Sequence, residues 1–134
     1  MLVVVDTNIL VSAFWSKNGT PAKIIGLIQN GIITPCYDYR ILEEYTEVLS
    51  RAKFGFDTWE IDDFLSQIKH DGMSIVSSPV DIPFADESDK KFYEAAKYCN
   101  ARLITGNTRH FPSDGIAVSP ADFLNSFTHI PSER

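Results

Sequence analysis

Short apolar segments alternate with longer amphipathic segments along almost the whole of this chain. Residues 2–5 form a run without a polar side chain, which is typical of a parallel strand buried on both faces. The alternation predicts an α/β protein with a central, mostly parallel five-stranded sheet that is covered by helices on both faces. The predicted strands are residues 2–5, 32–36, 74–76, 101–105 and 116–118.

Helical periodicity fills the segments between these strands. Thr20 and Pro21 predict a helix start, with Thr20 as N-cap and Pro21 at the first helical position, and Asn30-Gly31 predicts its end. The chain shows no repeat or linker, so residues 1–134 are expected to form a single domain, with 128–134 as a frayed tail. The other predicted helices are residues 9–15, 39–52, 57–70, 86–99 and 119–127.

Composition is that of an ordinary globular protein, with 44% hydrophobic and 22% charged residues. The net charge of −6 counts against a nucleic-acid binder unless bound cations offset clustered carboxylates. No segment has the length of a membrane span or the pattern of a signal peptide, and we therefore expect a cytoplasmic protein without membrane contact. Cys36 and Cys99 fit no metal-binding spacing and are expected to be free thiols.

Polar residues follow two of the predicted strands directly. In parallel sheets covered by helices, ligands bind beyond the carboxyl ends of the strands. Asp6 follows the first strand and Asn107 follows the fourth, so both are expected at this edge. Asp6 could alternatively serve only as the cap of the next helix.

Two further acidic positions fall in predicted helices, and their pattern alone leaves their role open. Asp89 lies at a helix start, where Asp86 as N-cap and Asp89 three residues later also fit a capping arrangement. Glu44 shares its helix with Glu43 and Glu47, and most such glutamates simply face water. If carboxylates cluster without a cation, their mutual repulsion favours proton uptake.

Four segments together resemble the PIN-domain family, and in particular the toxin components of toxin–antitoxin systems, the group that includes VapC-like ribonucleases. The resemblance spans nearly the whole chain and implies a three-layer α/β/α PIN-like fold. Each segment matches a family motif in order and spacing: VVDTNILVS at 4–12, ILEEYTEVLSR at 41–51, DESDKKFYEAA at 86–96 and LITGNTRHF at 103–111.

The resemblance also implies an activity, namely metal-dependent endonucleolytic hydrolysis of RNA with Mg²⁺ or Mn²⁺ as cofactor. Oxygen ligands are what such hard cations prefer. The implied catalytic and metal-binding carboxylates are Asp6, Glu44 and Asp89, with Asp86 and Asn107 as reserve ligands. Asn107 stands where many members carry Asp, which weakens the case for a second metal. The implied supporting residues, which orient the ligands, are Thr7, Asn8, Thr105 and Asn107.

Substrate and partner contacts are the least constrained expectations. Arg109, His110 and Lys17 are candidates for contacts with RNA phosphates. The resemblance implies an antitoxin protein as a possible partner and a homodimer built on the first two helices.

Two other functional classes remain alternatives. A PIN fold that has lost activity could act as a scaffold or regulatory module, and Asn107 motivates that alternative. Phosphatase or receiver chemistry on Asp6 is disfavoured, because phosphatases of that type want a second Asp where Asn8 stands, and a receiver would need paired acids at the first strand and a late Lys.

Overall fold

A computed structural model describes residues 1–128 of the chain. Its centre is one five-stranded sheet in the order β3-β2-β1-β4-β5, and every neighbouring pair of strands is parallel. The predicted parallel sheet and three-layer architecture are therefore confirmed. The strands are β1 (Leu2–Val5), β2 (Thr34–Tyr37), β3 (Met73–Ser74), β4 (Arg102–Ile104) and β5 (Ala117–Val118).

Strand β1 occupies the middle of the sheet because its side chains can be buried on both faces. Val3, Val4 and Val5 are all at most 1% exposed. The register pairs Val5 with Ile104 of β4, so these two strands end side by side. Consequently the residues that follow β1 and β4 meet at one edge of the sheet, the edge at which ligands bind in parallel sheets covered by helices.

The helices follow the predicted pattern with shifts at their ends. Gly19 is the N-cap of the second helix and Thr20 is its first residue, one position from the prediction. The segment predicted as one helix over 86–99 begins as a 3₁₀ turn, η1 (Glu87–Asp89), and becomes α-helical at Lys90. The helices are α1 (Thr7–Trp15), α2 (Thr20–Gln29), α3 (Tyr39–Leu49), α4 (Thr58–Asp71), α5 (Lys90–Cys99) and α6 (Pro120–Thr128), with a second 3₁₀ turn, η2 (Thr108–His110).

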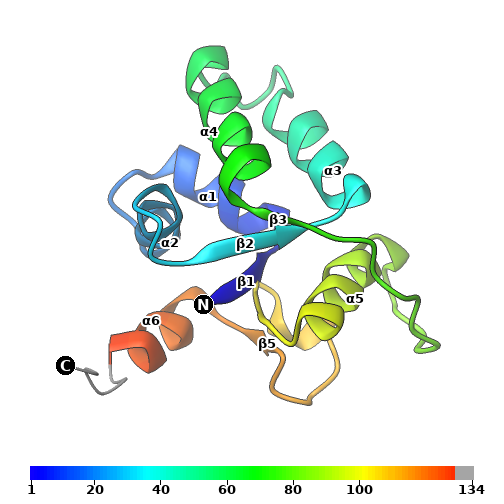
Figure 1. The fold of residues 1–134 in the computed structure, drawn as a ribbon. Coiled ribbons are helices and arrows are strands. Elements are labelled where there is room, and N and C mark those ends of the chain that lie inside the picture. The colour runs from blue at the N-terminus through cyan, green and yellow to red at the C-terminus, as the bar shows by residue number, and fades with distance from the viewer. Residues whose placement is uncertain (129–134) are drawn as a thin grey trace.

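These helices make the two outer layers around the sheet (Figure 1). Helix α5 packs against β1, β2 and β4, whereas α1 packs against α2 and α3, and α3 packs against α4. The predicted tail over 128–134 lies outside the described residues, except for Thr128 at the end of α6.

The core joins these layers through large buried side chains. Tyr45 of α3, Phe92 of α5 and Leu10 of α1 are each at most 1% exposed. Cys36 is buried and Cys99 is partly buried, and both thiols are free, as predicted. Among residues 1–128, no helix is both long enough and apolar enough to cross a membrane.

Candidate active site

Asp6 lies at the carboxyl end of β1, where the chain turns into α1. Its backbone N–H donates to the carbonyl oxygen of Ile104 at 2.9 Å, which extends the pairing of β1 with β4 by one residue. The hydroxyl of Thr105, which is fully buried, donates to Asp6 Oδ2 at 2.8 Å. The end of β4 therefore fixes the orientation of the Asp6 carboxylate.

The environment of Asp6 is unfavourable for an isolated negative charge. Only 6% of the residue is exposed. Burial raises its pKa to about 6; the hydrogen bond from Thr105 opposes this rise, while the charges of Asp89 and Glu44 add to it. Asp6 occupies the N-cap position of α1 without a capping hydrogen bond of ordinary geometry, and the backbone N–H of Asn8 is the weakest of the influences on its pKa. A capping role alone therefore does not account for the burial of this carboxylate.

Glu44 is held from two sides. The hydroxyl of Thr7, which is itself buried, donates a hydrogen bond to Glu44 Oε2. The ammonium of Lys91 on α5 lies 2.7 Å from Glu44 Oε1. The neighbouring Glu43 and Glu47 are exposed, and Glu47 pairs with Arg51 one turn along α3. Of the three glutamates on this helix, Glu44 is the one directed toward Thr7 and α5.

Asp89 lies at the junction of η1 and α5. Burial and the nearby charge of Asp86 raise its pKa, and His110 and Lys91 act in the opposite direction. Nδ1 of His110, on η2, lies 3.5 Å from Asp89 Oδ2. Together with the effect of Asp89 on the pKa of Asp6, these contacts show that Asp6, Glu44 and Asp89 share one electrostatic environment.

Asp86 behaves differently from these three carboxylates. It is exposed, and its side chain accepts hydrogen bonds from the backbone N–H and the hydroxyl of Ser88, at 3.0 and 2.7 Å. These bonds lower its pKa. The predicted N-cap role of Asp86 is confirmed, and its proximity to Asp89 keeps it a candidate reserve ligand.

A short turn after β4 closes the other side of the site. Asn8 Oδ1 accepts a hydrogen bond from the backbone N–H of Gly106 at 3.3 Å, and the Asn107 N–H donates to Thr105 Oγ1 at 3.0 Å. The Asn107 side chain is exposed and makes no capping bond to η2. Hydrogen bonds of Asn8 and Thr105 thus connect α1, β4 and the turn. The side-chain amide of Asn107 lies at the exposed edge of the site.

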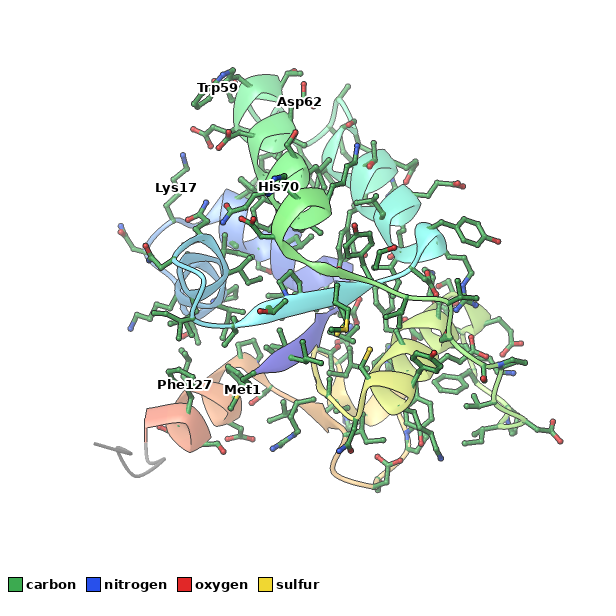
Figure 2. All side chains as sticks on the ribbon, viewed as in Figure 1. Met1, Lys17, Trp59, Asp62, His70 and Phe127 are labelled. Atoms are coloured by element: carbon green, nitrogen blue, oxygen red, sulfur yellow. The ribbon has the colours of Figure 1, made fainter. Side chains whose placement is uncertain are left out.

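The candidate substrate contacts separate into two groups. Arg109 and His110 lie on η2, next to Asn107, and both are exposed. Lys17 lies beyond the far end of α1, a helix roughly 14 Å long, and its ammonium pairs with Glu60 of α4 at 2.9 Å. Lys17 and Trp59 project near each other at the outer end of the molecule (Figure 2). The structure therefore gives Lys17 a partner remote from Asp6.

Several residues that support the site have no clear signal in the sequence. Tyr45 is buried in the core, and its hydroxyl donates to the carbonyl oxygen of Val5, immediately before Asp6. Burial, together with the charges of Asp6 and Glu44, raises the pKa of Tyr45. The sequence around Glu44 and Tyr45 contains no pattern that would predict the hydrogen bond from Tyr45 to Val5.

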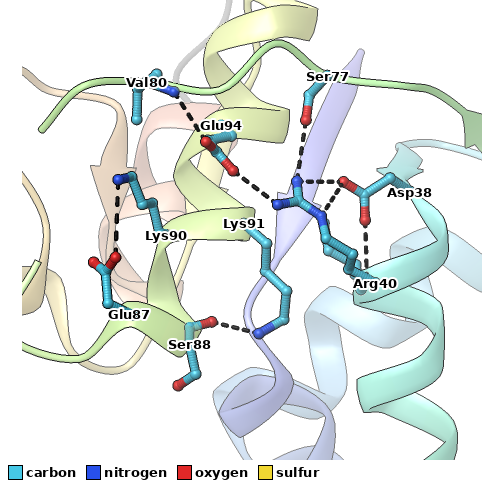
Figure 3. A network of polar contacts seen from close by, with 10 residues as sticks. Asp38, Arg40, Ser77, Val80, Glu87, Ser88, Lys90, Lys91 and Glu94 are labelled. Carbon is cyan, nitrogen blue, oxygen red and sulfur yellow. Dashed lines mark hydrogen bonds and ion pairs between the residues drawn. The ribbon is translucent and has the colours of Figure 1, made fainter.

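A partly buried ion-pair network, also absent from the sequence predictions, ties α3 to α5 (Figure 3). The Arg40 guanidinium contacts Asp38 Oδ2 at 2.7 Å and Glu94 Oε1 at 2.9 Å, and both carboxylates are nearly inaccessible to solvent. Asp38 also caps α3 through the Ile41 N–H, and Glu94 accepts the Val80 N–H at 2.9 Å. Arg40 lies one turn before Glu44 on α3, so the network joins the helix that carries Glu44 to the helix that follows Asp89.

The donor chemistry of this edge suits a divalent cation. Asp6, Glu44 and Asp89 supply the carboxylate oxygens that hard cations bind, and the raised pKa of Asp6 reports negative charge that the protein leaves only partly compensated. Within residues 1–128, however, no three or more His, Cys, Asp or Glu side chains are grouped closely enough to hold a metal ion as they stand. Lys91 and His110 lie against two of the three carboxylates instead.

The fold and the site together define an α/β protein with carboxylates and amides gathered beyond the carboxyl ends of β1 and β4. A family model for the PIN domain matches residues 2–109. The chain therefore belongs to the PIN-domain family, whose members are generally nucleases and generally use divalent metal ions. No curated protein is similar enough to this chain to count as a match.

Proposed function

We propose that this protein is a metal-dependent endoribonuclease, with Asp6, Glu44 and Asp89 as its catalytic carboxylates. The observation that carries this proposal is the buried Asp6, whose charge is destabilised by burial and by two neighbouring carboxylates. Such an arrangement costs stability without a well-formed capping hydrogen bond in return, as expected for a site kept for its chemistry.

Asp6, Glu44 and Asp89 would hold Mg²⁺ or Mn²⁺, with Asp86 and Asn107 as further oxygen donors at the rim. When bound, the ion supplies a water of lowered pKa and positive charge near the phosphate oxygens. The chain contributes the orientation of the ligands: the Thr105 hydroxyl directs the Asp6 carboxylate, and the Thr7 hydroxyl directs Glu44.

The exposed edge next to these carboxylates is the surface on which RNA would lie. Arg109 and His110 are exposed on η2 and are the candidates for contacts with phosphates flanking the cleaved bond. We leave Lys17 out of this surface because Glu60 engages it at the other end of α1.

A role as the toxin of a toxin–antitoxin pair, acting in the cytoplasm, is part of this proposal and rests on the four motif segments. An antitoxin would then block the edge of the sheet where Asp6, Glu44 and Asp89 lie. A homodimer through α1 and α2 has limited support, because Trp15 is the one large apolar side chain of these two helices that is mostly exposed.

The alternative function, an inactive PIN-fold scaffold, is favoured by Asn107 and by the ion pair between Lys91 and Glu44. Cleavage of a mixed RNA pool in Mn²⁺, Mg²⁺ or EDTA, comparing the wild type with Asp6→Asn, separates the two. Metal-dependent cleavage that is lost in Asp6→Asn supports the nuclease. If the folded protein, freed of any bound inhibitor, cuts RNA with neither metal, the scaffold replaces it.

A further inference from the structure

Lys91, on the first turn of α5, has an unusual position for a lysine. Its side chain is only 13% exposed, and its ammonium lies 2.7 Å from Glu44 Oε1. The same ammonium donates to the carbonyl oxygen of Ser88 (Figure 3). It also lies 5.0 Å from the centre of the Phe92 ring. Lysine is a flexible, strongly hydrated side chain, so holding it here requires compensating contacts.

The charge of Lys91 acts on more than Glu44. Besides the direct contact with Glu44, it opposes the rise in the pKa of Asp89 and adds to the lowering of the pKa of Asp86. A single ammonium therefore contacts one carboxylate of the site and lies close enough to two neighbouring carboxylates to act on their charge. That is the electrostatic position a divalent cation would occupy in the proposed nuclease.

Two ion pairs bridge α3 and α5, and they differ in their surroundings. Arg40 lies between two buried carboxylates, those of Asp38 and Glu94, and it also contacts the Ser77 hydroxyl. Arg40 and Lys91 both line an open groove of about 440 Å³ that includes Glu43 and Glu47. Arg40 is therefore fixed by several partners, whereas Lys91 pairs with the single carboxylate of Glu44 and has other carboxylates along the same groove.

We propose that Lys91 is a resident counter-cation of the catalytic carboxylates, and that a divalent metal ion must displace its ammonium from Glu44 in order to bind. The inference rests on the proposed nuclease site and adds a displacement step to the binding of its metal ion. It also accounts for a carboxylate set that has the right chemistry but is not grouped around a metal position, because Lys91 holds Glu44 toward α5.

The first test measures Mn²⁺ binding by calorimetry in Lys91→Met, with Lys90→Met as the matched control. Met preserves most of the side-chain volume, and Lys90 is the adjacent lysine, paired only loosely with Glu87 at 4.0 Å. Removing a competing ion pair should tighten Mn²⁺ binding roughly tenfold in Lys91→Met. Lys90→Met removes the same unit of charge and should change binding less than about twofold.

The second test uses the wild-type protein, so it does not depend on folding of a variant. An amine-reactive ester, followed by mass spectrometry, reports the accessibility of each lysine with and without Mg²⁺. Labelling of Lys91 should rise several-fold when Mg²⁺ is added, while labelling of Lys90 stays constant. Unchanged labelling of Lys91 at a Mg²⁺ concentration that supports cleavage would overturn the displacement step.

The outcomes separate this inference from the proposed function. If the wild type binds Mn²⁺ and cuts RNA but Lys91→Met binds no more tightly than Lys90→Met, the displacement is wrong and the nuclease stands. If only Lys91→Met binds Mn²⁺, Lys91 blocks the site permanently, so the displacement step is wrong and the wild type is a scaffold rather than a nuclease. If neither the wild type nor Lys91→Met binds Mn²⁺, both the displacement step and the proposed nuclease are refuted.

Discussion

Replacing Asp6 by Asn should stabilise the metal-free protein while removing its proposed activity. Asp6 is buried, and its pKa in the folded state rises from 3.8 to about 6. A shift of roughly two pKa units corresponds to about 3 kcal/mol of stability lost when the carboxyl ionises in the folded protein. Asn keeps an oxygen that can accept the Thr105 hydrogen bond and carries no charge.

The pH dependence of this difference follows from the direction of the shift. Below about pH 3 the carboxyl is protonated in both the folded and the unfolded chain, so the wild type carries no ionisation penalty. Between about pH 3 and pH 6 the unfolded chain loses its proton first, and the wild type becomes progressively less stable than Asp6→Asn. Above pH 7 the full difference of about 3 kcal/mol should be present.

Urea denaturation in EDTA at several pH values between 4 and 8 measures this difference directly. The matched control is Asp86→Asn, because Asp86 is exposed and its pKa is lowered by hydrogen bonds from Ser88. That variant should be less stable than the wild type at neutral pH, the opposite sign, and the loss should fade as the pH falls below the pKa of an unfolded Asp. Equal stabilities of Asp6→Asn and wild type at pH 8 would refute the claim that Asp6 is held at an energetic cost.

Three further outcomes are expected from other parts of the fold. Arg40→Met should lower the free energy of unfolding by about 3 kcal/mol in urea titrations, since it leaves two buried carboxylates without their cation; a loss below about 1 kcal/mol would contradict this. Lys17→Ala should keep RNA cleavage within about twofold of wild type, because Lys17 pairs with Glu60 away from the site; a tenfold loss would restore it as a substrate contact. Burial raises the pKa of Cys36 to about 12, so a thiol reagent at pH 8 should modify Cys99 alone in the native protein, as counted by mass spectrometry.

The sequence predicted most of the fold because each strand of the sheet carries a local signal. The apolar run at 2–5 and the turn-forming residues after it define β1 without reference to the rest of the chain. Errors occur where the local signal is degenerate. Nothing in DESDKK distinguishes one continuous helix from a 3₁₀ turn that passes into a helix at Lys90, and tertiary contacts of Asp89 decide between them.

The candidate site was predictable only as a set of positions. Ligands bind beyond the carboxyl ends of parallel strands, and this rule predicted Asp6 and Asn107 on one edge of the sheet. The structure does bring the residues after β1 and β4 together. Which glutamate of α3 faces that edge depends on helix packing, and the sequence left Glu44 open against its neighbours. The contacts of Lys91 were not predictable, because a lysine two residues after an aspartate is ordinarily a solvated surface charge.

The arrangement of charges explains how an acidic chain can keep an acidic site folded. Arg40 neutralises the buried carboxylates of Asp38 and Glu94, and Lys91 pairs with Glu44. Asp6 has no ion pair among the described residues, and burial is the main reason why its pKa rises to about 6, against the opposing hydrogen bond from the Thr105 hydroxyl. A divalent ion that displaced Lys91 would relieve the charge on Asp6 at the same time, so metal binding and stability should increase together in the wild type and be uncoupled in Asp6→Asn.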